Sequence, residues 1–552
     1  MIKISKNVRL RSILIITIMI VGVSSFLLGR GDLYRDISDN WKFVFEVYKR
    51  IMTHYAEQID PKKLAEAGVR GMMSELDPYT VYLEETDNHN LNLLTKGKYG
   101  GVGIHLGEQD DSLTVISPMD DSPAKRSGIL PGDKIIAVDG DPTRGMGLDG
   151  AARRIRGQRG TKVVLTIRRY GENENLDFEL TRDVITIEDV SFAGIVQGDV
   201  GYIRLSRFSK NSPKEMRRAL KSLKEQDAGK IILDLRGNSG GLLDAAIRIL
   251  EMVTDKGDPL LSTRGRNQEA ERDYVSQLDP IIDSSIGLAV LIDGGSASAS
   301  EIIAGTVQDL DRGVILGNQS FGKGLVQSIY PVDDNRSLKL TTAKYYVPSG
   351  RLIQKPGYVD KEIVIGWTEE DSIFSTQNGR RVTAKGGITP DIVVDQMKVP
   401  PLTRECWRRG FFFKFSTVYL TEHDLNLPVS VDDAMLEEFR QFIETKEITL
   451  NLKGEKHFTA LEEMLDSTAV ENRRIEHSLS VLRDYFDASK ADLFDNERKY
   501  LALGLEREMS SLIGGISARI QSSFDDDPVI LKTIEVLSDK VVYDNTLNVS
   551  EF

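Results

Sequence analysis

The chain has 552 residues, which predicts roughly three or four domains and leaves room for a sizeable hydrophobic core. Its 71 basic and 84 acidic side chains give a net charge of −13 at pH 7, and this acidic balance argues against a general nucleic-acid-binding protein held by phosphate contacts. The single cysteine, Cys406, excludes a disulfide framework and a cysteine-rich zinc site, and it fits an oxidising or a reducing compartment.

The amino terminus predicts a membrane anchor. Four basic residues within positions 3–11 precede residues 12–29, which carry no charge and are mostly Ile, Leu, Val and Met. A cleaved signal peptide and a buried amino-terminal helix are the alternatives, but no A-x-A pattern follows and the segment has no polar face. Because basic flanks stay cytoplasmic, we expect residues 1–30 to be a cytoplasmic basic segment and an uncleaved anchor, with the rest of the chain outside that membrane.

Residues 31–96 are predicted to be helical. Apolar side chains recur there at spacings of three and four, for example Val44, Val47, Tyr48 and Ile51. From residue 97 to residue 183 short strands with glycine punctuation predict a compact unit that contains one helix near residues 148–155.

From residue 184 to residue 396 strands and helices alternate, which predicts a parallel-leaning sheet covered by helices. A capping box from Ser212 to Glu215 is expected to open one of these helices. Residues 397–552 are again helical in pattern and carry no catalytic signature. Within them Gly410–Phe415 predicts a buried segment, with an interface as the alternative, and we expect the helical region to mediate self-association.

Three clusters of glycine and serine follow successive predicted strands: RGNSGG at 236–241, GGSASASE at 294–301 and SFGKG at 320–324. The carboxyl ends of parallel strands share one edge of a sheet, so we expect the three clusters to meet there. RGNSGG does not have the glycine order of a dinucleotide-binding turn.

The stretch GNQSFGKG, Gly317–Gly324, is close to a phosphate-binding loop. Such a loop ends in a Ser or Thr and continues into a helix, whereas Gly324 is followed by an extended pattern. A nucleotide hydrolase is therefore disfavoured, and Lys323 needs another role.

Ser298 is a candidate nucleophile. Ser298 and Glu301 also read as a capping box, so from the local pattern alone the serine could do no more than start a helix. Small residues at a strand-to-helix turn equally allow its hydroxyl to project into a cleft, with the next amide facing an oxyanion. No histidine lies between residues 106 and 422. A histidine base would have to come from a flanking helix or from the glycine-punctuated unit. The other candidate is a lysine with a pKa lowered by burial, and Lys323 sits between small and apolar neighbours, with no carboxylate beside it in sequence.

Residues from about 35 to 395 resemble the C-terminal processing proteases, also called tail-specific proteases. The resemblance rests on the motifs LDPYTVYL (76–83), YGGVGI (99–104), SPAKRSGILPGDKIIAVDG (122–140), DLRGNSGGLL (234–243), SASASEI (296–302), FGKGLVQ (321–327), LKLTTAKYYVPSGR (338–351) and GITPDI (387–392).

The resemblance implies an α/β multidomain protein: an amino-terminal membrane anchor, a PDZ domain at 97–183, a ClpP/crotonase-like α/β protease core at 184–396 and a helical carboxyl-terminal domain at 397–552. It implies a serine endopeptidase that cleaves proteins or peptides near their carboxyl termini and needs no cofactor or metal. By resemblance Ser298 is the nucleophile, Lys323 is the general base, Gln327 orients the lysine, and the amides of Gly241 and Ala299 form the oxyanion hole.

In the PDZ domain the implied peptide-binding loop is Gly101-Val102-Gly103-Ile104, whose amides would capture a terminal carboxylate, and an ordinary tight turn is the alternative. The expected partners are the carboxyl-terminal tails of proteins, an adaptor protein and further copies of the chain, with no nucleic acid. The expected location is the bacterial cell envelope, on a single-pass inner-membrane anchor. A catalytically silent PDZ scaffold of the same fold is the alternative function.

Overall fold

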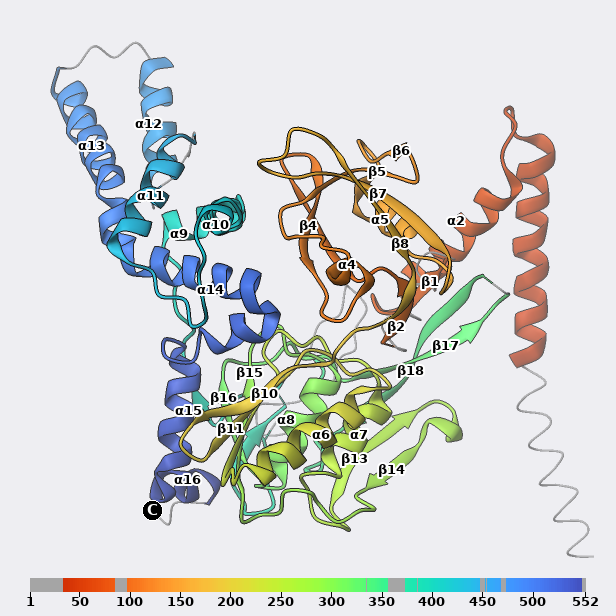
Figure 1. Cartoon of the computed structure of the whole chain (residues 1–552). Coiled ribbons are helices and arrows are strands. Elements are labelled where there is room, and N and C mark those ends of the chain that lie inside the picture. Colours follow the sequence, from red (N-terminus) through yellow and green to blue (C-terminus); the bar gives the residue numbers. More distant parts are fainter. Residues whose placement is uncertain are drawn as a thin grey trace, which may run out of the picture. The chain divides into compact units, whose positions relative to one another are not determined.

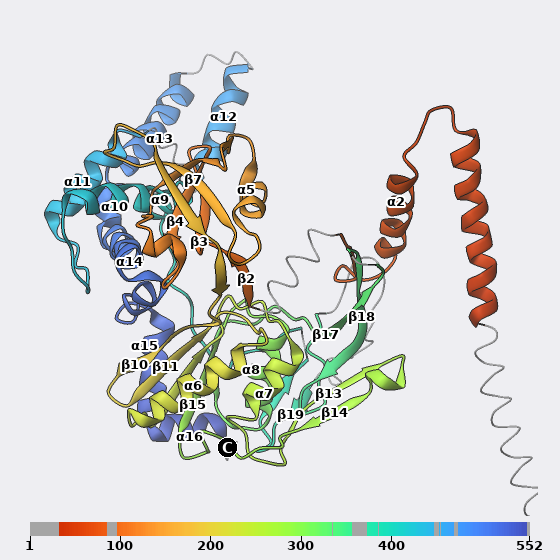
Figure 2. The same cartoon turned by 45° about the vertical axis from the view of Figure 1, so that its right-hand side comes forward.

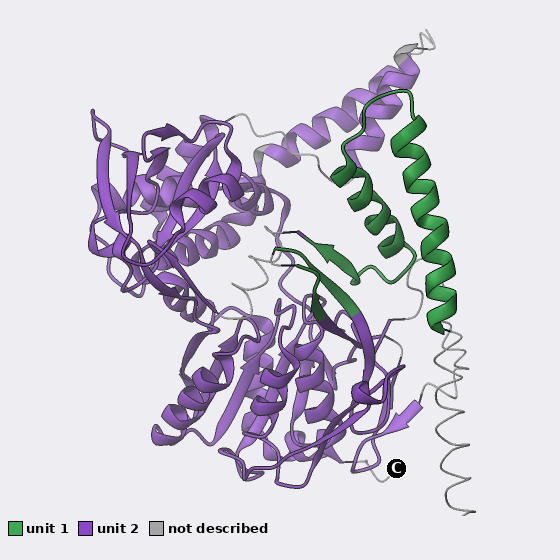
Figure 3. Cartoon of the chain, turned by 90° about the vertical axis from the view of Figure 1, so that its right-hand side faces the viewer, with its two compact units in different colours: residues 1–83, 329–340 green, residues 84–328, 341–552 purple. Residues whose placement is uncertain are grey.

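The computed structural model describes residues 33–84, 97–333, 335–355, 373–384, 386–446, 452, 454–467 and 473–548. The chain divides into two compact units, which Figure 3 shows in different colours. The smaller unit comprises residues 1–83 and 329–340, and the larger one comprises residues 84–328 and 341–552.

The smaller unit contains a helix over residues 33–54 and helix α2 (Pro61–Ser74). The α2 helix begins at Pro61 because the Asp60 carboxylate accepts a hydrogen bond from the Lys62 amide, and a proline is tolerated in the first turn. The helical prediction for residues 31–96 holds as far as Ser74. Residues Val81–Leu83 instead form strand β1, because β18 (Ser337–Tyr346) provides an antiparallel partner for them.

Residues 98–186 form a β-rich subdomain in which every strand pair is antiparallel. Five strands pair in the order β3-β4-β5-β7-β8, β6 lies beside β5, and β2 pairs with β9. In β7 (Lys162–Arg168) alternate residues face the core, since Val163, Leu165 and Ile167 are all fully buried. The elements are β2 (Lys98–Gly101), β3 (Ile104–Gln109), β4 (Ser112–Pro118), α4 (Pro123–Arg126), β5 (Lys134–Val138), β6 (Asp141–Pro142), α5 (Gly147–Ile155), β7 (Lys162–Arg168), β8 (Leu176–Thr181) and β9 (Asp183–Thr186).

The sheet of the protease core has the strand order β10-β11-β12-β15-β16-β21. The pair β10 and β11 is antiparallel, and all the other neighbours are parallel, which confirms the predicted parallel-leaning sheet. Its central strands are almost continuously apolar because both of their faces are covered. The strands are β10 (Val190–Gln197), β11 (Val200–Leu205), β12 (Lys230–Asp234), β15 (Gly287–Ile292), β16 (Val314–Gly317) and β21 (Ile392–Val393).

Helices cover both faces of this sheet. One face packs against α6 (Ser212–Glu225), α7 (Leu243–Leu250) and α8 (Ala299–Asp309), in a core that includes Ile203 and Leu233. The other face, which includes Tyr202 and Ile232, packs against α15 (Pro528–Ser538) and α16 (Lys540–Leu547). Figures 1 and 2 show α15 and α16 beside the sheet strands, so the last helices of the chain complete the third layer of the protease core.

The start of α6 differs from the sequence prediction. Ser212 is the first helical residue, and Asn211 occupies the cap position. The Glu215 carboxylate, predicted to close a capping box, instead accepts hydrogen bonds from the amides of Asp189 and Val190. A tertiary contact therefore takes the carboxylate that the local pattern assigned to the helix start.

A second, antiparallel sheet has the order β1-β18-β13-β14, and β17 also pairs with β18. The strands β19 and β20 form a separate two-stranded ribbon. These elements are β13 (Pro259–Gly265), η1 (Gln268–Ala270), β14 (Arg272–Val275), β17 (Leu325–Pro331), β19 (Ile373–Ser375) and β20 (Arg381–Thr383).

The helices of the carboxyl-terminal region enclose an aromatic core. Phe412 stacks on Phe439, and Phe415 meets Phe439 edge to face. Phe411, Phe412 and Phe413 are buried, as predicted for residues 410–415. The helices are α9 (Pro401–Arg408), α10 (Phe411–Glu422), α11 (Asp433–Glu444), α12 (Glu455–Ser467), α13 (Arg473–Ala491) and α14 (Leu493–Gln521), the last with a break at Gly514 and Gly515.

The prediction of a membrane anchor, and of the location that follows from it, is contradicted by the structure. A helix needs about 20 predominantly apolar residues to cross a bilayer. Among the residues that the structure describes, no helix reaches this length with enough apolar character, which contradicts the prediction of an inner-membrane anchor that holds the protein in the cell envelope. Residues 12–29, on which that prediction rested, lie outside the described residues.

Candidate active site

Three loops leave neighbouring parallel strands at one edge of the protease sheet. They follow β12, β15 and β16, which pair in that order. The Ala297 amide donates a hydrogen bond to the Asn238 carbonyl at 3.0 Å, and the Phe321 amide donates to the Ser296 carbonyl at 3.0 Å. The structure therefore brings the three glycine and serine clusters together, as the sequence predicted.

Ser298 occupies the turn between β15 and α8 with a strained backbone. Its φ is 55° and its ψ is −113°, a conformation that non-glycine residues seldom adopt and that costs on the order of 1–3 kcal/mol. Its amide donates to Glu301 Oε2 at 2.8 Å, which is the carboxylate half of the predicted capping box. The residue is partly exposed. A strained, partly exposed serine at a strand-to-helix turn is the arrangement of a nucleophile elbow.

Glu301 connects the serine turn to the lysine loop. It is completely buried, and its Oε1 accepts hydrogen bonds from the Ser320 hydroxyl at 2.5 Å and the Gly322 amide at 2.6 Å. Its Oε2 accepts from the amides of Ser298 at 2.8 Å and Lys323 at 2.9 Å. Burial raises the pKa of Glu301, and the four donors oppose that rise by stabilising the carboxylate. A single oxygen atom thus holds both Ser298 and Lys323 by their backbones.

Tyr345 on β18 makes a second link between the same two residues. Its hydroxyl lies 3.1 Å from the Ser298 carbonyl oxygen and 2.5 Å from the Lys323 carbonyl oxygen, so one phenolic proton serves both acceptors. Burial raises the pKa of Tyr345, and the nearby Glu301 charge raises it further, so the hydroxyl keeps its proton.

Two glycines allow the loop after β12 to approach the serine turn. Gly240 has a φ of +97°, and a Cβ there would lie 2.6 Å from the Ala297 carbonyl oxygen and 2.9 Å from the Ala299 nitrogen. Gly241 has a φ of +149°, and a Cβ there would lie 2.1 Å from the Phe208 carbonyl oxygen. Any side chain at either position would push the loop away from Ala299 or from Phe208.

The amides around this contact differ in their hydrogen bonds. The Gly240 amide donates to Asn238 Oδ1 at 2.9 Å. The amides of Gly241 and Ala299 have no acceptor in the part of the chain that the structure describes. Two backbone N–H groups at adjoining turns, one of them at the start of α8, can stabilise an anion.

Lys323 is partly buried and lies two residues before the start of β17. No carboxylate lies beside Lys323 in sequence, but the fold brings the Glu301 carboxylate to the Lys323 amide. His105, the histidine that directly precedes the histidine-free stretch, lies on β3 of the β-rich subdomain. Burial lowers the pKa of His105, and the Arg207 charge lowers it further.

Gln327, predicted to orient the lysine, lies on β17. Its Nε2 donates to Thr341 Oγ1 on the neighbouring strand β18, at 3.5 Å. The predicted role of Gln327 toward Lys323 stays a prediction.

The four predicted peptide-binding residues connect β2 to β3. The Val102 carbonyl accepts a hydrogen bond from the Ala124 amide at 3.0 Å, and the Gly103 carbonyl accepts one from the Met119 amide at 2.9 Å. Gly101 ends β2 and Ile104 begins β3, so the loop is anchored at both of its ends.

The segment after Gly324 settles the question of a phosphate-binding loop. Residues Leu325–Pro331 form strand β17, as predicted, and no helix follows whose amino end could face a phosphate. The resemblance to a nucleotide-binding loop is therefore limited to the spacing of its glycines and lysine.

Sequence reasoning did not assign two residues of this site. Glu301 was noticed only as a capping residue, and nothing in sequence connects it to Ser320 or Gly322. Tyr345 lies 47 positions from Ser298 and was part of a recognised motif, LKLTTAKYYVPSGR, without an individual role.

Comparison with known proteins identifies families that match most of the chain. Residues 199–365 match Peptidase family S41, residues 92–168 match the PDZ domain, residues 402–537 match the family "Probable PDZ-protease, C-terminal helical domain" and residues 30–87 match "Activating protease CtpB N-terminal domain".

Two curated relatives carry the same name. The carboxy-terminal-processing protease of Bartonella bacilliformis is 40% identical over 324 residues, which cover 58% of this chain and 74% of that protein. The carboxy-terminal processing protease CtpB of Bacillus subtilis is 35% identical over 316 residues, covering 56% of this chain and 65% of the relative. Among solved structures, a photosystem II D1 C-terminal processing protease is 27% identical, with 64% of this chain and 92% of that chain covered and a TM-score of 0.35.

The fold and the site define a serine peptidase with a PDZ domain, an α/β protease core and a helical carboxyl-terminal domain. The chain belongs to the carboxy-terminal processing proteases of peptidase family S41.

Proposed function

We propose that Ser298 and Lys323 form the catalytic dyad of this peptidase. The observation that carries the proposal is the shared acceptor: the amides of Ser298 and Lys323 both donate to Oε2 of Glu301. The Tyr345 hydroxyl, which contacts both of their carbonyl oxygens, supports it. A nucleophilic serine with a lysine base is an established alternative to the triad with histidine.

The proposed reaction is acyl transfer. The uncharged Lys323 amine takes the proton of the Ser298 hydroxyl as Oγ bonds to the scissile carbonyl carbon, and the carbonyl electron pair moves onto oxygen. That tetrahedral intermediate then expels the amine of the leaving peptide, which takes the proton from Lys323. A water molecule, deprotonated by the same amine, adds to the acyl carbon, and collapse releases the acid and returns the proton to Ser298.

The proposed oxyanion hole consists of the amides of Gly241 and Ala299. Both are without an acceptor among the described residues, whereas the Gly240 amide is already bonded to Asn238. An oxyanion donor of this kind contributes a factor of about 10² to 10³ to kcat. In this proposal Gln327 holds the lysine from β17.

The PDZ match supports recognition of a substrate's carboxyl-terminal tail. We assign the tail carboxylate to the loop of Gly101, Val102, Gly103 and Ile104, with the tail adding as a strand. In this proposal residues 97–183 recognise the tail and residues 184–396 carry out cleavage, while the helical region 397–552 contacts other chains and also contributes α15 and α16 to the layers of the protease core.

We also propose self-association. Apolar side chains of α13, within the helical region 397–552 that was expected to self-associate, are exposed, among them Val481, Leu482 and Tyr485. The partner is a second copy of this chain, and an adaptor protein is the other partner that the helical regions would accept. Sedimentation equilibrium that shows a monomer at micromolar concentration would contradict the first assignment.

Three variants test the dyad. Ser298→Ala and Lys323→Ala should abolish cleavage of a peptide with a free carboxyl terminus, while the midpoint of thermal unfolding stays close to that of the wild type. Lys323→Arg should be equally inactive, because a guanidinium keeps the charge but cannot lose its proton at neutral pH. A folded Lys323→Ala or Lys323→Arg protein with near-wild-type turnover would show that the dyad is wrong.

The silent scaffold is tested in the same experiment. A fluorophosphonate probe should label the wild type at Ser298, and the label should be absent from Ser298→Ala. Wild-type protein that cleaves no tail peptide and takes no label would favour the scaffold.

A further inference from the structure

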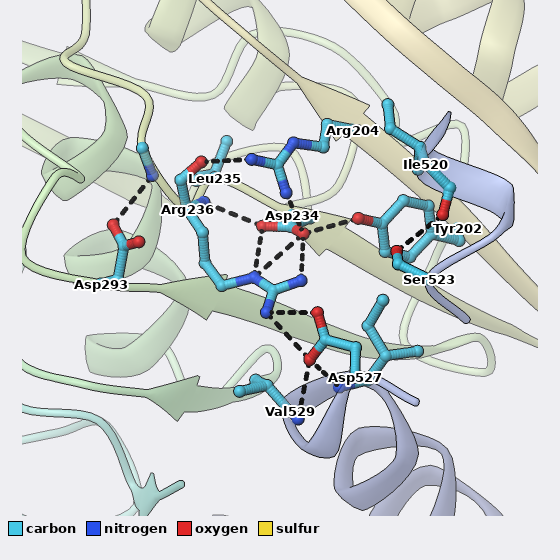
Figure 4. Close-up of polar contacts among 12 residues, drawn as sticks. Tyr202, Arg204, Asp234, Leu235, Arg236, Asp293, Ile520, Ser523, Asp527 and Val529 are labelled. Atoms are coloured by element: carbon cyan, nitrogen blue, oxygen red, sulfur yellow. Dashed lines mark hydrogen bonds and ion pairs between the residues drawn. The ribbon is translucent and has the colours of Figure 1, made fainter. Parts of the chain in front are cut away.

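A buried charge cluster lies at the end of β12, where the loop that carries Gly241 begins. Figure 4 shows its centre, Asp234, which is completely buried. The Asp234 carboxylate accepts hydrogen bonds from the Tyr202 hydroxyl at 2.5 Å, from Arg204 at 2.7 Å and from Arg236 at 2.7 Å. Burial raises the pKa of Asp234, but the charges of Arg236 and Arg204 outweigh burial and bring that pKa to about 2. The group is therefore a carboxylate at neutral pH.

Asp527, at the start of α15, balances the charge of this cluster. Two guanidinium groups face the single carboxylate of Asp234, which leaves one positive charge in excess. The Asp527 oxygens lie 2.9 and 3.1 Å from Nη1 of Arg236, and Figure 4 shows this guanidinium between the two aspartates. Side-chain exposure is 9% for Arg236 and 18% for Asp527, so an unpaired charge here would be strongly unfavourable.

The cluster also fixes the backbone at the start of the loop. The Arg236 amide donates to Asp234 Oδ1 at 2.8 Å, and its carbonyl accepts a hydrogen bond from Arg204 at 2.9 Å. The next amide, that of Gly237, donates to Asp293 Oδ1 at 2.8 Å. The peptide groups on both sides of Arg236 are therefore held by side chains: Asp234 at the end of β12 on one side, and Arg204 and Asp293 of other segments on the other.

These hydrogen bonds matter because the loop between Arg236 and Leu242 has a backbone with unusually wide conformational freedom. Between Arg236 and Leu242 three of five residues are glycines with positive φ, which restrict the backbone little. The middle of the loop is held through Asn238, whose Nδ2 donates to the Leu205 carbonyl at 2.8 Å, and its end is held by Phe208. Its beginning is held at Arg236 and at the Gly237 amide, which donates to Asp293.

We propose that Arg236 and Asp527 are positioning residues for peptide cleavage: the first turn of α15, near the end of the chain, holds the start of the loop that presents the Gly241 amide. The inference rests on the proposed function, because it needs Gly241 as an oxyanion donor. Neither residue contacts the substrate in this proposal. The carboxyl-terminal segment thereby affects catalysis through the loop that carries Gly241, in addition to covering the sheet.

Asp527→Asn is the sharpest test. Asp527 also caps α15 by accepting hydrogen bonds from the amides of Val529 and Ile530. Asparagine can keep that cap through its one oxygen, but it places an uncharged NH₂ donor against Arg236. Complete loss of an oxyanion donor lowers kcat by about 10² to 10³, so a displaced donor should lower kcat about tenfold or more, with KM within about twofold.

A second readout separates positioning from general stability. A peptide boronic acid forms a tetrahedral adduct with Ser298 that places an oxygen in the oxyanion hole, so its affinity should fall by the same factor as kcat. Peptide affinity, measured in the Ser298→Ala background, should not change. Arg236→Lys keeps the charge but not the guanidinium fork that reaches both aspartates, so it should lower kcat and boronate affinity in the same way as Asp527→Asn. It tests the same contact if Asp527→Asn fails to fold.

Asp526→Asn is the matched control. Asp526 precedes Asp527, is comparably buried and pairs with Arg507 at 2.7 Å, away from the loop. It should leave kcat and boronate affinity unchanged. The positioning role would be overturned if folded Asp527→Asn and Arg236→Lys kept wild-type kcat and boronate affinity. It would also be overturned if Asp526→Asn lost as much as they do. Either result would leave the Ser298 mechanism standing. A wild-type enzyme that is insensitive to the boronate would overturn the proposed function and this inference with it.

Discussion

The Glu301 carboxylate offers the most direct test of how the site is held together. It accepts four hydrogen bonds, two at each oxygen, and it is the shared acceptor for Ser298 and Lys323. Glu301→Gln replaces one oxygen by an NH₂ group of nearly the same size, so it changes hydrogen bonding with little change in volume. Glu301→Ala removes all four acceptor contacts.

The structure predicts how the side-chain amide of the Glu301→Gln variant is oriented, with its oxygen toward Ser298 and Lys323. The amides of Ser298 and Lys323 can only donate, so an NH₂ group on their side would leave two buried donors unpaired. On the other side the Gly322 amide loses its acceptor, and the Ser320 hydroxyl, which already accepts from the Ile388 amide, can turn to accept from the new NH₂ group as well. An unpaired buried donor costs about 1–3 kcal/mol, so Glu301→Gln should lower the free energy of unfolding by that amount.

Activity should follow the geometry of the dyad. Because the oxygen that holds Ser298 and Lys323 is retained, Glu301→Gln should keep measurable turnover, with kcat reduced about tenfold. Glu301→Ala should lose about 10²-fold or more, since a misplacement of about 1 Å between reacting groups has that effect. Urea unfolding measures the stability and peptide cleavage under saturating substrate measures kcat.

Glu497 provides a matched control in the carboxyl-terminal helices. It is buried and accepts hydrogen bonds from the amides of Leu402 and Thr403 and from the Thr403 hydroxyl. Glu497→Gln should lower stability by a similar amount without changing kcat. Full activity and full stability in Glu301→Ala, or an equal fall in kcat in Glu497→Gln, would refute the reasoning.

Two further predictions concern a glycine and the cysteine. Gly240→Ala should lower both stability and kcat, because its Cβ would meet backbone atoms of the serine turn at 2.6 and 2.9 Å. Gly237→Ala is the control, since Gly237 has a φ of +69° and a Cβ there would have nothing within 4 Å. It should cost only about 1 kcal/mol of backbone strain in urea unfolding. Burial raises the pKa of the Cys406 thiol to about 12. At pH 8 a thiol reagent should therefore label the folded protein at least about 100-fold more slowly than the unfolded chain. Rapid labelling of the folded protein would contradict the buried position. Because the folded state keeps this proton while the unfolded state loses it, the Cys406 contribution should make stability fall as pH rises from about 9 toward 12.

The sequence by itself determined the alternation of strands and helices in the protease core. Apolar runs such as Ile231–Leu233 and the glycine clusters that follow each strand are local signals, and parallel pairing then places those clusters at one edge. The absence of histidine between residues 106 and 422 favours a lysine base, which stays a prediction; the structure shows that the amides of Ser298 and Lys323 share the Glu301 carboxylate. The predictions needed only periodicity, turn chemistry and a census of side chains.

Only the tertiary structure decided how buried polar groups are shared. Glu215 was predicted to cap its own helix, but it binds the amides of Asp189 and Val190, and Glu301 serves a loop about 20 residues away as well as its own helix. Arg236 and Asp527, 291 positions apart, meet across the sheet. A buried donor or acceptor needs a partner, yet sequence spacing does not say which distant segment will supply it, because that choice is made when the layers pack.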